Sequence, residues 1–152
     1  MNFTLPTKAR KFFKTVTEQR SPRWLMFDSW YICMLVGVRL RTLGPKEDLE
    51  GAEFFDAYPE DFKPAADFIA GLLIDAELER KGIDVDDKAS VEGEMVLLLD
   101  PQRTTGLSET GLELLNRYAV AGFTRIDELM LPPASVEDLL VRYGAICGGD
   151  GE

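Results

Sequence analysis

The amino-acid sequence contains no histidine among its 152 residues. Without histidine the chain has no Ser-His or Cys-His nucleophile pair, no histidine ligand for a metal and none of the commonest general base. The glycine-rich motifs that bind phosphates, G-x-x-x-x-G-K-S/T and G-x-G-x-x-G, are absent too. Only carboxylate chemistry is left, so we expect a protein that is not an enzyme and that carries no cofactor and no metal.

Cysteines and long apolar runs are scarce. The two cysteines, Cys33 and Cys147, lie far apart in the sequence and form no C-x-x-C pair of the kind found in redox and zinc sites. The longest apolar run, from Trp24 to Val38, has 15 residues and contains Asp28, so it is too short to cross a membrane. These features predict a cytoplasmic protein with reduced cysteines and no membrane contact.

Length and composition indicate one folded domain. Hydrophobic residues make up 45% of the chain and charged residues 29%, which is ordinary for a globular protein. A chain of this length buries a single core. We expect one helical domain over residues 1–145, followed by a flexible tail of glycine and acidic residues over 146–152.

The spacing of apolar residues predicts helices. The expected helices begin near Thr7, at Ser21 with Pro22, at Pro64, at Ser90, at Ser108 and near Ser135. Residues 91–99 fit either a helix or a buried strand, and we favour the helix because a lone strand would have no partner. The helix that ends near Arg41 is apolar nearly all round. The predicted fold is therefore all-α, a single-domain orthogonal bundle of five or six helices around this central apolar helix.

Four glycines fall inside or near the start of predicted helices: Gly37, Gly71, Gly111 and Gly122. A glycine within a helix costs about 1 kcal/mol relative to alanine unless another interaction compensates. Close approach of two helices is such a compensation, so we expect helices to cross at these positions.

Charge is distributed unevenly along the chain. Residues 1–41 hold eight basic and two acidic side chains, whereas residues 42–152 hold nine basic and 25 acidic ones. The total of -10 therefore conceals a basic start. Such a polarised surface can steer a charged partner to one face, while the acidic remainder opposes non-specific binding to nucleic acids.

The basic start supplies the candidate residues for nucleic-acid contact. They are Lys8, Arg10, Lys11, Lys14, Arg20 and Arg23. These cations could line a phosphate-binding face, and Trp24 is near enough in sequence to stack on a base. Helix faces that are simply solvated have the same composition, so both interpretations stay open.

Two further features concern carboxylates. Asp28 lies within the most apolar helix, where we expect a structural buried acid paired with an arginine such as Arg20 or Arg125. Asp75 and Glu79 stand four positions apart on one predicted helix and could contribute to a magnesium site, or form a solvated acidic face. In a chain with 27 acidic residues the second interpretation is favoured.

The order of elements resembles a known family. A basic opening helix, the apolar helix WLMFDSWYICMLVGV, the segment FIAGLLIDAELE, the helix LLNRYAVAGFTRIDEL and a closing VEDLLVRY are similar to the small accessory proteins of DNA phosphorothioation (Dnd-type) modification and restriction systems. Tyr118, Ala119 and Gly122 match the Tyr-Ala-Asn-Gly-Gly motif of that family, with Val120 and Ala121 at the other positions. A weaker similarity, over about Thr7 to Leu40, is to the DndE family of small helical DNA-binding proteins. The resemblance implies a role in antiviral defence and transfers no catalytic residue.

The sequence thus supports a leading hypothesis and two alternatives. The leading hypothesis is a non-enzymatic accessory or adaptor protein that contacts larger protein components of a phosphorothioation-dependent restriction-modification system. The first alternative is direct binding of DNA, at nicks or ends, through the basic N-terminal helices. The second is a carboxylate-metal nuclease or phosphatase. Assembly into a homo-oligomer is left open.

Overall fold

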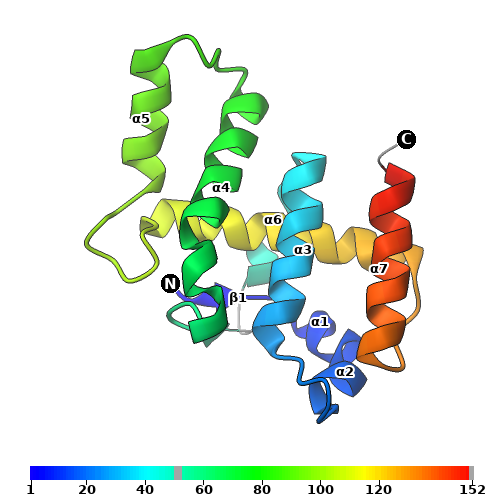
Figure 1. Cartoon of the computed structure of the whole chain (residues 1–152). Coiled ribbons are helices and arrows are strands. Elements are labelled where there is room, and N and C mark those ends of the chain that lie inside the picture. The colour runs from blue at the N-terminus through cyan, green and yellow to red at the C-terminus, as the bar shows by residue number, and fades with distance from the viewer. Residues whose placement is uncertain (50–52, 151–152) are drawn as a thin grey trace.

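The computed structural model describes residues 1–49 and 53–150, and it is mainly α-helical, which confirms the predicted fold class (Figure 1). In chain order the elements are β1 (Phe3–Thr4), α1 (Thr7–Phe12), α2 (Lys14–Glu18), α3 (Met26–Leu40), the 3-10 helix η1 (Lys46–Leu49), β2 (Glu53–Phe55), the 3-10 helix η2 (Glu60–Ala65), α4 (Ala66–Lys81), α5 (Lys88–Leu98), α6 (Glu109–Leu129) and α7 (Val136–Asp150). Figure 1 shows α6 running behind α3 and α4 while α4 and α5 form a hairpin at one side.

Helices α3 and α6 form the centre of the bundle, and glycines let their backbones touch. A Cβ atom added to Gly37 would lie 1.7 Å from the Tyr118 carbonyl oxygen, and one added to Gly122 would lie 1.7 Å from the Cys33 carbonyl oxygen. Gly111 likewise faces the Leu98 carbonyl oxygen, at 2.2 Å. The crossing predicted from helical glycines is therefore confirmed at these three positions. Gly71 has open space around it instead, so it marks no helix contact.

A buried asparagine on α6 attaches the N-terminal residues to the bundle. The Asn116 Oδ1 atom accepts hydrogen bonds from the Thr4 backbone N–H at 3.1 Å and from the Trp30 Nε1–H at 3.0 Å, and its Nδ2 donates to the Asn2 carbonyl oxygen at 2.9 Å. Strand β1 also pairs antiparallel with β2, with Phe3 opposite Phe55. This short sheet was not predicted, because neither strand is long enough to show alternation in the sequence.

Several helix boundaries differ from the predicted ones. The first predicted helix is divided at Phe13 into α1 and α2, which brings the described residues to seven α-helices. Helix α3 begins at Met26 rather than Pro22, because the Asp28 carboxylate binds the Leu25 backbone N–H at 2.7 Å and starts the helix there. Helix α5 is confirmed, but Asp87 rather than Ser90 is its N-cap.

The C-terminal helix is longer than predicted. Helix α7 continues through Gly144 to Asp150, so it includes most of the segment 146–152 that the sequence sets apart as a tail. Residues 151 and 152 lie outside the described part of the chain. At its start, the Ser135 hydroxyl accepts a hydrogen bond from the Asp138 backbone N–H at 3.0 Å, which agrees with the helix start predicted near Ser135.

A fully buried carboxylate joins α4 to α6. The Tyr118 hydroxyl donates to Glu77 Oε2 at 2.5 Å, and Arg80 donates to both Glu77 oxygens at 2.7 Å. Burial alone would raise the pKa of Glu77, but the hydrogen bonds from Arg80 and Tyr118, with the charges of Arg80 and Lys81, lower it overall. The ionised form of Glu77 therefore stabilises the folded chain.

We predict that Gly122→Ala destabilises the protein by about 3 kcal/mol or more, because the new methyl group would meet backbone atoms that cannot rotate away. Urea denaturation followed by circular dichroism measures the change. Gly71→Ala is the matched control, for which we expect a gain of up to about 1 kcal/mol, since the site is open and helical. Equal effects of the two substitutions would contradict the glycine crossing.

We also predict that Glu77→Gln lowers the free energy of unfolding by about 2 to 4 kcal/mol at neutral pH, since Arg80 and Tyr118 lose an ionised partner. Because the pKa of Glu77 is lower in the folded than in the unfolded chain, its contribution is present above about pH 4.3 and is lost as the pH falls further. The difference between parent and variant should therefore shrink on acidification. The exposed Glu92→Gln serves as the control, and a gap independent of pH would refute the assignment.

Candidate interaction site at the start of helix α3

The first two helices are held on the bundle by their apolar side chains, which turns their basic side chains outward. Phe12 and Phe13 are buried and both rings pack near the Phe123 ring of α6, with centroids 5.5 and 6.1 Å apart. Arg10 and Lys14 stand four positions apart and are both exposed beside these buried rings. The sequence pattern thus fixes the direction of this basic face.

Two adjoining hollows follow the edge between α2, the segment 19–25 and the start of α3. One, of about 230 Å³, is lined by Arg10, Lys14, Thr17, Glu18, Met26 and Phe54. The other, of about 470 Å³, is lined by Thr17, Glu18, Gln19, Arg20, Arg23, Trp24, Leu25 and Met26. Because the two share Thr17, Glu18 and Met26, we treat them as one feature and name it the basic groove.

The four cations of the groove have no acidic partner in the described part of the chain. Arg10, Lys14, Arg20 and Arg23 make no ion pair there, although Arg10 donates a hydrogen bond to the Glu53 carbonyl oxygen at 3.1 Å. Glu18 is the acidic side chain among the lining residues. The groove therefore carries excess positive charge that is available to a ligand.

Apolar side chains lie between these cations. Trp24, Met26 and Phe54 are each half-buried and line the groove. The Trp24 Nε1–H donates to the Ser29 hydroxyl at 2.8 Å, which fixes the orientation of the indole. A ligand with both apolar and acidic groups would therefore find partners for both.

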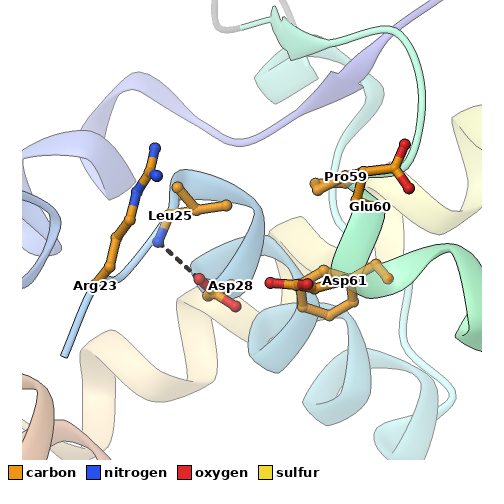
Figure 2. Close-up of a pocket in the computed structure, with 7 residues that line it drawn as sticks. Arg23, Leu25, Asp28, Pro59, Glu60 and Asp61 are labelled. Carbon is orange, nitrogen blue, oxygen red and sulfur yellow. Dashed lines mark hydrogen bonds between the residues drawn. The ribbon is translucent and has the colours of Figure 1, made fainter.

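A third hollow adjoins the groove and carries the opposite charge. It has a volume of about 440 Å³, and its lining includes Arg23 and Leu25, which it shares with the groove. We name it the acidic hollow, for Asp28, Glu60 and Asp61. Figure 2 shows the Asp28 and Asp61 carboxylates pointing toward each other, while the Glu60 carboxylate and the Arg23 guanidinium point away.

Asp28 behaves differently from the sequence expectation. It is half-buried rather than buried, and neither Arg20 nor Arg125 pairs with it; Arg125 lies 3.6 Å from Glu128 instead. Its partner is the Leu25 N–H at the start of α3. Burial raises the pKa of Asp28, the Leu25 hydrogen bond opposes that change, and the negative charge of Asp61 adds to it.

The other predicted basic residues lie outside the groove or are already engaged. Lys8 pairs with Asp127 at 2.7 Å, and Lys11 is exposed on α1 but does not line either hollow. Arg41 binds both Asp75 and Glu79, at 2.7 and 2.9 Å, so the carboxylate pair considered for magnesium serves to join α3 to α4. The structure thus brings together Arg10, Lys14, Arg20 and Arg23 and separates the rest.

The motif residues lie at the centre of the bundle. Tyr118, Ala119 and Gly122 are all buried on α6, with Tyr118 and Gly122 at the crossing with α3. Sequence reasoning did not identify Met26 and Phe54 as groove residues. Phe54 reaches the groove from β2, and no local pattern signals that placement.

The described residues contain neither a membrane-spanning helix nor a cluster of metal ligands. No helix among them is long and apolar enough to cross a membrane. Within residues 1–49 and 53–150, no three acidic or cysteine side chains are placed to share a metal ion, and this includes the carboxylates of the acidic hollow.

We predict that Asp61→Asn lowers the pKa of Asp28, because it removes the nearby negative charge while burial is retained. Carboxyl NMR titration of the folded protein measures this pKa directly. Glu60→Gln is the matched control, since the Glu60 carboxylate points away from Asp28 (Figure 2) and should leave its pKa unchanged. An equal response to both substitutions would show that Asp61 has no specific effect.

Comparisons with protein-family models, with curated proteins and with solved structures found no match to this chain. The resemblance to accessory proteins of DNA phosphorothioation stays a prediction that depends on element order and on Tyr118, Ala119 and Gly122. The basic groove is defined by the residues of this chain alone.

Proposed function

We propose that the protein is a non-enzymatic accessory protein that holds an acidic segment of a larger partner protein in the basic groove. The observation that carries this proposal is a set of four cations, Arg10, Lys14, Arg20 and Arg23, that meet no acidic partner within residues 1–49 and 53–150. They surround an apolar floor, which is formed by Trp24, Met26 and Phe54. Their chemistry suits carboxylates, and the floor suits one or two apolar side chains between them.

The groove offers two sources of affinity. Arginine forms charge-assisted and often bidentate hydrogen bonds with carboxylates, and these are about twice as strong as neutral hydrogen bonds. Covering Trp24, Met26 and Phe54 contributes about 25 cal/mol for each Å² of apolar surface removed from water. The charges select and orient the partner, while the apolar contacts hold it.

The surroundings of the groove favour a peptide over a DNA duplex. Glu18 lines both hollows, and the acidic hollow with Asp28, Glu60 and Asp61 adjoins one end. A duplex has a phosphate charge about every 1.7 Å along its axis and would bring several of them against these carboxylates. A peptide can place its few acidic residues only where the cations are.

The resemblance supplies the biological setting of this proposal. If the chain acts as the accessory proteins of DNA phosphorothioation systems do, the partner is a nuclease, ATPase or helicase component of cytoplasmic phage defence. Genes for a cysteine desulfurase and a sulfur-transfer enzyme beside the gene of this protein would support that setting.

We predict that the full chain binds a short fluorescent peptide in which aspartates alternate with leucines, as measured by fluorescence anisotropy. Arg20→Glu with Arg23→Glu should weaken this binding about tenfold or more, because attraction becomes repulsion at the larger hollow. Arg23→Glu alone should already weaken the binding, and Lys11→Glu is its matched control. Lys11→Glu reverses one charge in the same way on an exposed residue of α1 outside the groove, and should have little effect.

A duplex DNA of similar charge is measured in parallel over a series of salt concentrations. Direct DNA binding would replace the proposal if three results are found together. DNA binds more tightly than the peptide, its affinity falls steeply with salt, and Lys11→Glu and Lys14→Glu each weaken that affinity. Failure of both probes to bind would refute a ligand role for the groove.

A further inference from the structure

The turn between α4 and α5 has the chemistry that the basic groove should bind. It reads Gly-Ile-Asp-Val-Asp-Asp over residues 82–87, and Asp84, Asp86 and Asp87 are all exposed. Val85 lies among them with 71% of its surface accessible. The turn thus presents an apolar side chain flanked by carboxylates, which matches the apolar floor of the groove and its flanking cations.

The turn is also well defined in shape. Gly82, with φ +67°, caps the end of α4. The Asp84 side chain accepts from the Asp86 N–H at 2.9 Å, and the Asp87 side chain caps α5 by accepting from the Ser90 N–H at 3.3 Å. A structured turn loses less conformational entropy on binding than a flexible segment does. Val85 and Asp86 are both exposed, and the Asp86 carboxylate makes no hydrogen bond in the described part of the chain, so both side chains are accessible to a partner.

The turn cannot reach the groove of its own chain. Figure 1 shows it at the far end of the α4–α5 hairpin, with α2 and the start of α3 at the opposite side of the molecule. We propose that the acidic turn of one copy binds the basic groove of a second copy, so that the chain self-associates head to tail. This inference uses the same groove as the proposed function and names one occupant for it.

Such an interface joins two different surfaces, so each bound pair keeps one free groove and one free turn. Assembly therefore continues to a ring or an open chain. A single turn in a groove buries a small area, so the contact should be weak, concentration-dependent and sensitive to salt. An acidic partner segment would compete with it for Arg20 and Arg23.

The test is sedimentation of the full chain over a range of concentrations at low and high ionic strength. The mass of the parent should rise above 17.0 kDa with concentration at low salt and return to that value at high salt. Val85→Ser with Asp86→Asn alters the turn without adding positive charge, and Arg20→Glu with Arg23→Glu alters the groove. Each variant alone should remain monomeric.

Mixing the two variants gives the decisive measurement. One retains an intact groove and the other an intact turn, so an equimolar mixture should form a dimer of twice the chain mass and grow no further. A parent that is monomeric throughout, a mixture that does not dimerise, or self-association unchanged by either variant would overturn the inference. Binding of the acidic peptide at dilutions where the chain is monomeric tests the proposed function separately.

Discussion

The structure depends on the contact between the backbones of α3 and α6 at Gly37 and Gly122. Side chains at these positions would separate the two helices, so the absence of a Cβ atom sets the distance between them. The segments that carry most of the groove residues pack on these two helices or continue into them. The α1–α2 segment packs on α6 through Phe12 and Phe13. Trp24 lies just before α3, and Met26 is the first residue of that helix.

The arrangement of the helices around this crossing also determines where the charged side chains lie. Some cations that meet a carboxylate connect helices of the bundle, as Arg41 does with Asp75 and Glu79. The four cations of the basic groove, Arg10, Lys14, Arg20 and Arg23, meet none in the described residues. The charge asymmetry of the sequence therefore becomes an asymmetry of surface, with the basic groove beside the acidic hollow and the acidic turn on the opposite side.

Sequence reasoning predicted what depends on local pattern and missed what depends on distant contacts. The helical glycines Gly37, Gly111 and Gly122 predicted close helix crossings that the structure confirms. The predicted helix start at Ser108 is also confirmed, because Ser108 caps α6. Composition could not show that Asp28 caps α3 and pairs with no arginine, since that choice depends on where the helix begins. Likewise, Phe54 enters the groove through a strand pairing that no neighbouring residue signals.

The buried amide of Asn116 also constrains the order in which the chain can fold. Its hydrogen bond to Thr4 connects positions 112 residues apart, and the one to Trp30 connects positions 86 apart. Contacts between distant positions carry a large loop-closure entropy and form late unless other contacts have already brought the segments together. Because the α3–α6 crossing positions both Trp30 and Asn116, we expect the opening strand to join a core that this crossing has already formed.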